Sequence, residues 1–386
     1  MPTPEQLAAE ASEAEVGGEE LTALGYHLAT LPVDVRIGKL ILLGAVLQCV
    51  DRALTLAAAL TCRSPFVAPM GMRAEADEAK ANFAVGGSDH LALVQAYEHW
   101  DALPGARARA AFCQQHFLSM KTLETISATK RELLELLGEI GFVRGASDLR
   151  AASVERLGSA AAGSDGVRAA LGATASSGDG GGGGGVAGLH AELQLLKAIL
   201  VGAMWPKVAK VEAPAPKGGR GKGKGGKGGG KGGGKGGGKG GEANLKIHIK
   251  DDLGVREAQL HMSCVGAQPS CAKALQRANT FLVYSEAVQT FALNLRDVSS
   301  VPPMALMLFG GRLFFNAKAS LLALDDGWIR FKVQEEVATV ILAGRRQLDA
   351  MFERKMNKPD ADLSKEGGAL IEVVAKLIAN HAGVGT

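Results

Sequence analysis

The sequence predicts an α+β multidomain protein with an all-α N-terminal bundle, a small β-barrel after it, and C-terminal helices. Between residues 21 and 142, apolar residues recur every three or four positions, as in helices that bury one face. After residue 244 the period changes to two, as in Leu245, Ile247 and Ile249, which is typical of strands. Runs rich in small residues separate these parts.

The charge of the chain is concentrated in one segment. The 386 residues are 47% hydrophobic, which is enough for two or more compact domains, and the formal net charge is only +3. Residues 217–241 contain 17 Gly, seven Lys and one Arg. Removing these eight positive charges leaves the rest of the chain at −5. The chain is therefore a mildly acidic globular protein interrupted by two glycine-rich inserts, the other at 178–185, and not a uniformly basic nucleic-acid binder.

The first half predicts a series of amphipathic helices. Residues 1–20 lack a hydrophobic period and predict a disordered lead-in. Asp51 is placed to cap a helix that begins near residue 52, Ser119 to cap the last long helix, and Gly141 to end it. The helices are expected at residues 21–31, 36–50, 53–62, 72–83, 88–101, 106–117 and 120–140, within a bundle that spans 21–142.

The second half predicts a linker, one more bundle helix and a barrel. Residues 143–187 are rich in Ala, Ser and Gly and cannot bury enough apolar area to offset ordering entropy. Residues 188–211 complete the bundle and lead by a strand into the disordered insert at 212–243. The barrel is expected over 244–352 and a tail with a helix over 353–386. The strands of the barrel are expected to include 281–288, 291–298, 304–311 and 327–333. The C-terminal helices are expected at about 335–352 and 367–380.

Cysteine usage and apolar runs indicate the compartment. The five cysteines are scattered and form no CxxC pair, which argues against a disulfide framework and against a zinc site. The N-terminal residues do not resemble a secretory signal. The longest apolar uncharged run, residues 40–50, is far shorter than the roughly 20 residues of a membrane span. We expect an intracellular protein of the cytoplasm or nucleus with no membrane partner.

Motifs for catalysis are missing from the sequence. A phosphate-binding loop needs G-x-x-x-x-G-K-[ST], but Gly38-Lys39 is followed by Leu40, and no Gly-Lys pair of the insert precedes Ser or Thr. Residues 77–80 read Asp-Glu-Ala-Lys but lie in a helical pattern rather than after a buried strand. HExxH and Gly-x-Ser-x-Gly are also absent. We predict no catalytic residue and no metal site, and we expect Trp100, Trp205 and Trp328 to be core residues.

The lysine/glycine segment admits two interpretations. Its cations could release counterions from phosphates and bind nucleic acid without regard to base sequence. The alternative is a loop expansion whose charge only maintains solubility. The candidate phosphate contacts are Lys217, Arg220, Lys222, Lys224, Lys227, Lys231, Lys235 and Lys239.

Several motifs in one order resemble a known family. They include ELTALGYHLATLPVDVRIGKLILLGAVLQCVDRALTLAAALTCRSPFVAP, ADEAKANFAVGGSDHLALVQAYEHW, GAMWPKVAKV, FLVYSEAVQTFALNLRDVSSVPPMALMLFGG and LDDGWIRFKV. Together they resemble the helicase-associated region and the C-terminal OB-fold of DEAH/RHA-type ATP-dependent RNA helicases. HMSCV stands where that family usually has His-Pro-Ser-Ser-Val, with Met262 in place of proline. The resemblance covers roughly residues 21–142 and 188–352.

The resemblance implies a wall of a single-stranded RNA channel. The N-terminal part would be the end of a winged helix and a ratchet-like bundle. The RecA-like motor domains, which bind ATP and Mg²⁺, have no counterpart here and would act in cis or in trans, so this chain is not expected to bind those cofactors or to hydrolyse ATP unaided. Protein cofactors are further expected partners.

The candidate RNA contacts each have a structural alternative. Backbone N–H groups at Ser88, Asp89 and His90 could bind a phosphate, although Asp89 could instead cap its helix. The pair His261 and Ser263 could bind a base or phosphate, or form a turn. Two further candidates are Arg312 and Lys121, for which solvation is the alternative.

We therefore expect an RNA-binding accessory module of a DEAH/RHA-type helicase. The alternatives are a protein-interaction or regulatory module without RNA affinity, and a fragment of a complete 3'-5' RNA helicase.

Overall fold

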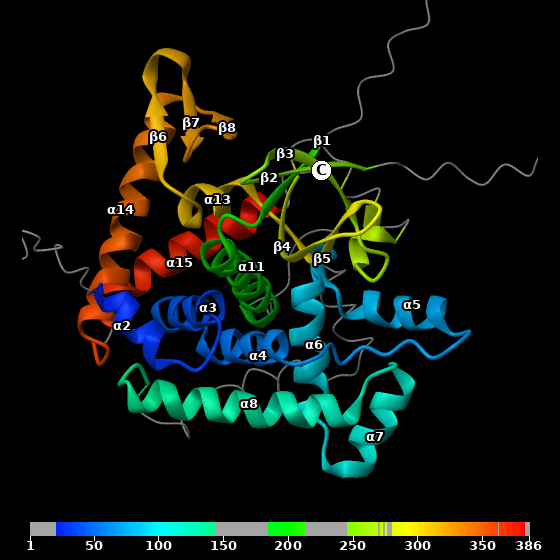
Figure 1. Cartoon of the computed structure of the whole chain (residues 1–386). Helices are drawn as coiled ribbons and strands as arrows, with labels where there is room; N and C mark the ends of the chain where they lie inside the picture. Colours follow the sequence, from blue (N-terminus) through cyan, green and yellow to red (C-terminus); the bar gives the residue numbers. More distant parts are fainter. Residues whose placement is uncertain are drawn as a thin grey trace, which may run out of the picture.

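The computed structural model describes residues 21–143, 184–212, 245–268, 271–272, 275, 280–361 and 363–382. They form a helical bundle, a closed barrel of five strands, a separate three-stranded sheet and two C-terminal helices (Figure 1). The predicted α+β class is confirmed. The predicted lead-in, almost all of the linker and the lysine/glycine insert lie outside the described residues.

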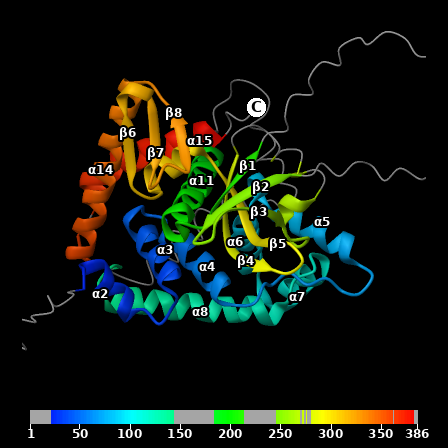
Figure 2. The same cartoon turned by 45° about the horizontal axis from the view of Figure 1, so that its top comes forward.

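The predicted helices of the first half are all present, with ends that differ by a few residues. They are α2 (Ala23–Thr30), α3 (Val35–Val46), α4 (Val50–Thr61), α5 (Arg73–Phe83), α6 (Asp89–Asp101), α7 (Gly105–Gln115) and α8 (Met120–Glu139). In Figure 2, α8 runs below α3 and α4, and it packs against α4.

Two of the three predicted helix signals are confirmed. The Oγ of Ser119 accepts a hydrogen bond from the backbone N–H of Thr122 at 3.3 Å, and Gly141 ends α8 with a φ of +82°. The prediction for Asp51 is wrong, because α4 begins one residue earlier, at Val50, without a side-chain cap. Asp51 lies in the first turn, where its carboxylate is 2.7 Å from the ammonium of Lys130.

The core of the molecule is built around α11 (Gly184–Met204), the predicted last helix of the bundle. This helix lies between α3 and the elements that follow the barrel, and it also touches the barrel (Figure 1). Leu193, Leu196 and Leu200 are fully buried, as expected for one apolar face, but Ile199 and Val201 on other faces are fully buried too. A helix that is buried on several faces, with even its Gln194 and Lys197 side chains buried, is typical of a central position.

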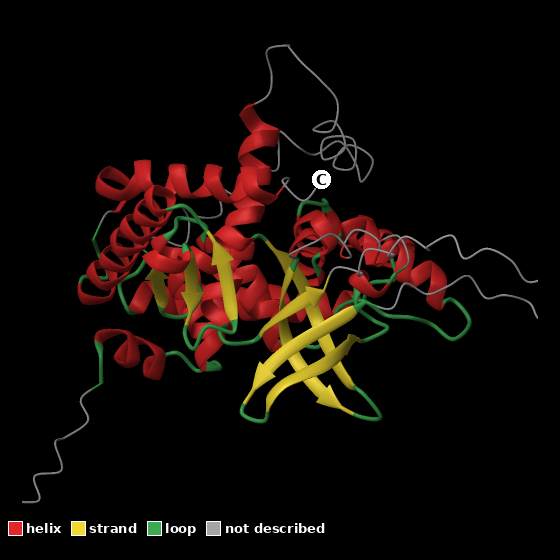
Figure 3. Ribbon diagram, turned by 90° about the horizontal axis from the view of Figure 1, so that it is seen from above, coloured by secondary structure: helices red, strands yellow, loops and turns green. Residues whose placement is uncertain are grey.

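The barrel is closed in the order β1-β2-β3-β5-β4. Its strands are β1 (Val208–Glu212), β2 (Lys246–Asp251), β3 (Gly254–Leu260), β4 (Phe281–Gln289) and β5 (Leu293–Val301). Alternate residues point inward, so that Val211, Ile247 and Leu295 are buried in one cluster, as the period of two predicts. Figure 3 shows these strands crossing beside the helices.

The predicted barrel range 244–352 is too long, because the barrel strands end at Val301. Residues 304–311, predicted as a strand, lie mostly in helix α13 (Pro303–Phe309), which begins with a proline at the position that tolerates one best. The next strands form a separate antiparallel sheet, since a closed barrel has no free edge to extend. They are β6 (Leu313–Asn316), β7 (Leu321–Leu324) and β8 (Ile329–Lys332).

The C-terminal helices are longer than predicted. They are α14 (Glu335–Asn357) and α15 (Leu363–Ala382). The sheet β6-β7-β8 lies beside α14 in Figures 1 and 2. Within the described ranges, no helix has the length and apolar character that a membrane span requires.

Candidate nucleic-acid interface

The N-terminus of α6 is buried against the barrel. The Oγ of Ser88 caps the helix by accepting a hydrogen bond from the N–H of Leu91 at 3.0 Å. One carboxylate oxygen of Asp89 accepts from the N–H of Val265 at 3.0 Å, and the other accepts from the N–H of Val298 at 2.9 Å. We call Ser88, Asp89, His90, Lys80 and Ser299 the bundle–barrel junction.

The other polar side chains of the junction also have close partners. The Nζ of Lys80 lies 2.7 Å from Asp89, and the two ring nitrogens of His90 lie 2.7 Å from the Oγ of Ser299 and 2.9 Å from the Oγ of Ser285. The residues predicted to contact RNA here, Ser88, Asp89 and His90, are at most 1% exposed. In this arrangement they cannot reach a phosphate, because their polar groups hold the bundle to the barrel.

His90 makes the stability of the junction depend on pH. Burial lowers the pKa of His90 to about 4; Asp89 opposes this shift, and the charges of Lys80 and Lys197 add to it. The unfolded chain therefore takes up a proton near pH 6.5 that the folded chain excludes. The contribution of neutral His90 is complete above pH 6.5 and is lost as the pH falls from 6.5 to 4.

We expect this loss to reach about 3 kcal/mol at pH 4, since one pKa unit corresponds to about 1.4 kcal/mol. Urea unfolding should show that the free energy of unfolding falls more steeply between pH 7.5 and pH 4 for the wild-type chain than for His90→Gln. Identical pH slopes for the two proteins would contradict the assignment to His90.

A second group of charges surrounds the predicted motif residues His261 and Ser263. The Nδ1 of His261 lies 2.7 Å from the Oγ of Ser263 and accepts from the Ser263 N–H at 3.2 Å, so the pair forms a turn. The Nζ of Lys80 donates to the carbonyl of Ser263 at 2.8 Å. His261 remains partly exposed at the end of β3.

Three cations lie around this turn. Burial lowers the pKa of His261, and the nearby charges of Arg296, Arg73 and Lys80 lower it further. Arg73 comes from α5 and has a side chain that is 49% exposed, and Arg296 is an exposed residue of β5. We call Arg73, Lys80, His261 and Arg296 the basic cluster. Sequence reasoning missed its three cations, since they come from elements distant in the chain.

The other candidate contacts lie on elements that do not contribute to the basic cluster. Lys121 is exposed in the first turn of α8. Arg312 is exposed just before β6, and its backbone N–H donates to Asp325 at 2.6 Å. The eight cations from Lys217 to Lys239 lie outside the described residues. Among the described residues, no group of three or more His, Cys, Asp or Glu side chains could hold a metal ion.

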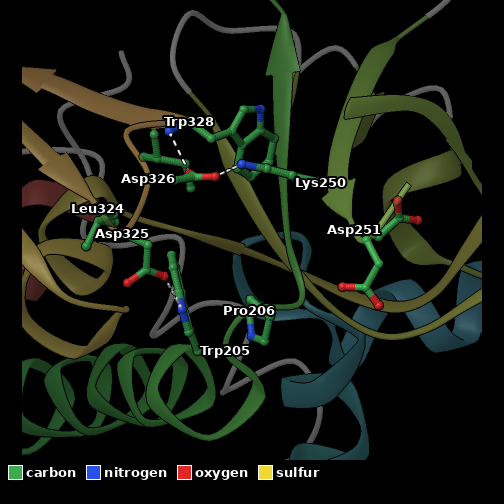
Figure 4. Close-up of a pocket in the computed structure, with 10 residues that line it drawn as sticks. Trp205, Pro206, Lys250, Asp251, Leu324, Asp325, Asp326 and Trp328 are labelled. Carbon is green, nitrogen blue, oxygen red and sulfur yellow. Dashed lines mark hydrogen bonds and ion pairs between the residues drawn. The ribbon is translucent and has the colours of Figure 1, made fainter. Parts of the chain in front are cut away.

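Of the three tryptophans predicted to be core residues, Trp100 is fully inside the core, and Trp205 and Trp328 pack against it from its edge. Trp100 is 1% exposed, but Trp205 and Trp328 are half-buried and line a cavity of about 200 Å³ between the barrel and the sheet β6-β7-β8 (Figure 4). Four aspartates and Lys250 line the same cavity. The Asp325-Asp326 pair before Trp328 was visible in the sequence, but nothing there indicated that Trp205 lies against it.

Comparisons with known proteins agree with this architecture. Residues 34–93 match the family described as helicase associated domain (HA2), ratchet-like, and residues 321–380 match the family described as C-terminal domain in RNA helicases. The first match covers α3 to the start of α6, including the junction residues Ser88, Asp89 and His90. The second covers β7, β8, α14 and most of α15.

The chain also resembles long helicases over almost its whole length. It is 37% identical to DHX57 of Mus musculus, 31% identical to the DExH-box ATP-dependent RNA helicase DExH1 of Arabidopsis thaliana and 28% identical to the ATP-dependent RNA helicase DHX29 of Homo sapiens. Each match covers 94% of this chain, but only 24%, 30% and 22% of the relative. The chain thus spans about a quarter of the length of these relatives. From the two domain matches and these relatives, the chain is similar to the helicase-associated and C-terminal domains of RNA helicases such as DHX57 and DExH1.

Proposed function

We propose that this chain is an RNA-binding accessory region of a DEAH/RHA-type helicase, and that its barrel, of the OB type, lines part of a single-stranded RNA channel. The motor domains, in cis or in trans, would bind ATP and Mg²⁺ and drive movement of the strand. The protein would act inside the cell, in the cytoplasm or nucleus. The names of the relatives support an RNA substrate, and the domain matches support the accessory role.

The basic cluster is the observation that carries this proposal. Phosphate groups are bound in proteins by Arg and Lys side chains, and the planar guanidinium is especially suited to them. Arg73 and Arg296 present two guanidinium groups from different elements beside the turn of His261. Two cations of the cluster also have a carboxylate partner: Arg73 lies 3.5 Å from Asp77 in a partly exposed pair, and Lys80 lies 2.7 Å from Asp89. The anion-binding groups that this proposal uses are therefore the exposed guanidinium groups of Arg73 and Arg296, although the chain outside its lysine/glycine segment is acidic.

The lysine/glycine segment joins the barrel at the end where the basic cluster lies, which supports RNA binding there. The segment connects β1 to β2, where Glu212 pairs with Lys246. Ile247 pairs with Ala258, so the segment leaves the barrel at the end where β3 leads into the turn of His261. Its eight cations would add phosphate contacts without base specificity to those of the basic cluster.

The test is a titration of a fluorescently labelled 12-nucleotide oligouridylate, followed by anisotropy at several salt concentrations. The double variant Arg73→Gln with Arg296→Gln should bind about tenfold more weakly at low salt. Its plot of log affinity against log salt should be shallower by about 1.4, since each lost single-strand phosphate contact removes about 0.7. The matched control, Arg131→Gln with Arg346→Gln, removes two exposed arginines of α8 and α14 and should bind as the wild type does.

A chain without residues 217–241 distinguishes binding by the lysine/glycine segment from binding by the basic cluster. We expect it to keep a measurable affinity that still depends on Arg73 and Arg296. Complete loss on this deletion alone would show that the barrel has no independent role. If the intact chain does not bind the oligonucleotide at low salt, the RNA proposal fails and the protein-interaction alternative stands.

A further inference from the structure

The cavity of about 200 Å³ is formed by three segments that meet only in the folded chain. They are the end of α11 with Trp205 and Pro206, the end of β2 with Lys250, and the turn between β7 and β8. Figure 4 shows the two indole rings on different sides of the space and the ion pair of Lys250 with Asp326 between them. The lining contains four aspartates and one lysine, and Arg256 beside it pairs with Asp251, so that the net formal charge at the cavity is −2.

The wall around Trp205 is held in place before any ligand arrives. Its Nε1 donates to one carboxylate oxygen of Asp325 at 2.9 Å, and the other oxygen accepts from the N–H of Arg312 at 2.6 Å. Gly311 leaves the room that this carboxylate needs, because a Cβ there would overlap it. A side chain at Gly310 would similarly crowd the ring of Trp205. The indole therefore presents a fixed edge and face to the cavity, which lowers the entropic cost of binding.

The lining selects the charge of the ligand. Asp252, Asp325 and Asp326 are exposed at the cavity, so a phosphate would meet carboxylates there and be repelled. A cation would gain from those carboxylates and from the negative faces of the two indoles. Guanidinium fits this combination better than ammonium, because it is planar, stacks on aromatic rings and donates several hydrogen bonds in one plane.

We propose that this cavity binds an arginine side chain from a basic peptide segment of a partner protein. The assignment rests on charge complementarity and on the two tryptophans, and it is independent of the proposed RNA binding at the basic cluster. The chain would therefore have two recognition surfaces of opposite charge, one for the phosphates of RNA and one for a basic protein segment.

The test uses the full chain and a nine-residue peptide of alternating Gly and Arg. Its control is the same peptide with citrulline, which has nearly the shape of arginine without the charge. Trp205 and Trp328 line the cavity and report binding by their fluorescence, and calorimetry gives the affinity independently. We expect the arginine peptide to bind at least about tenfold more tightly than the citrulline peptide.

Two variants locate the binding site. Asp252→Asn with Asp326→Asn keeps both indoles and should weaken arginine-peptide binding about tenfold, and Trp328→Leu should weaken it similarly. The control Glu132→Gln with Glu135→Gln removes two exposed carboxylates of α8 and should have no effect. Binding of the oligouridylate should be the same for the pocket variants and the wild type, which keeps this proposal separate from the RNA proposal.

Three outcomes would overturn the assignment. Equal affinity for the arginine and citrulline peptides would show that charge is not recognised. Equal loss in the α8 control would show a general electrostatic effect. Much tighter peptide binding to a chain without residues 217–241 would assign the cavity to the lysines of this chain in place of a partner.

Discussion

Replacing Asp89 by alanine is expected to lower the free energy of unfolding by at least about 5 kcal/mol. The substitution leaves the ammonium of Lys80, which is only 12% exposed, without its carboxylate, and breaking a buried ion pair in this way typically costs about 3–5 kcal/mol. It also removes the acceptor of the backbone N–H groups of Val265 and Val298, and each unsatisfied group adds roughly 1–3 kcal/mol.

Urea unfolding followed by circular dichroism measures this effect. The matched control is Asp101→Ala on the same helix, since Asp101 is 49% exposed and lies 3.4 Å from Arg109 in a surface ion pair. Such a pair contributes less than about 1 kcal/mol. An equal loss of stability in the two variants would show that Asp89 does not hold the junction. If Asp89→Ala does not fold, Asp89→Asn keeps one acceptor oxygen and should be destabilised less.

Replacing Arg52 by methionine is expected to cost about 3–5 kcal/mol at pH 7.5, because it leaves a buried carboxylate without its cation. Arg52 joins three helices of the bundle: its Nε lies 2.7 Å from Glu98 on α6, and its Nη1 lies 2.7 Å from Glu192 on α11. Burial raises the pKa of Glu98, and the charge and hydrogen bond of Arg52 oppose that shift. Without Arg52 the pKa of Glu98 should rise further.

The stability that Arg52→Met loses should therefore depend on pH. A carboxyl group whose pKa is raised in the folded state destabilises that state above the unfolded value near 4.5, and the penalty disappears as the pH falls toward that value. The difference in unfolding free energy between Arg52→Met and the wild type should thus narrow between pH 7.5 and 5. Adding Glu98→Gln to Arg52→Met should recover part of the loss at pH 7.5. A difference that does not change with pH, together with no recovery in the double variant, would contradict the ion-pair explanation.

Helix and strand positions were largely predictable because the relevant signals are local. The apolar period and the cap at Ser119 placed the helices of the bundle within a few residues, since an amphipathic face and an N-cap involve neighbours three or four positions apart. The wrong prediction for one segment also arose because only local signals were available. Residues 304–311 are apolar without a clear period, and a short apolar run does not distinguish a buried strand from a buried helix.

The candidate site was less predictable. The turn of His261 and Ser263 could be located by resemblance, but the cations of Arg73 and Arg296 reach it from α5 and β5. A helix N-terminus at Ser88 was predicted correctly, yet whether it meets solvent or a barrel strand depends on packing. This N-terminus was predicted to bind a phosphate, but it is buried, and its polar groups hold the bundle to the barrel instead.

The sequence alone determined the helical and strand segments, the concentration of positive charge between Lys217 and Gly241, and the order of motifs that indicates the helicase family. Each depends on residues close together in the chain. Only the tertiary structure decided which polar groups meet. Asp89 and Val298 are 209 positions apart, and Trp205 and Asp325 are 120 positions apart. No local period encodes such contacts, because they depend on barrel closure and on the packing of the bundle and the sheet β6-β7-β8 against the barrel.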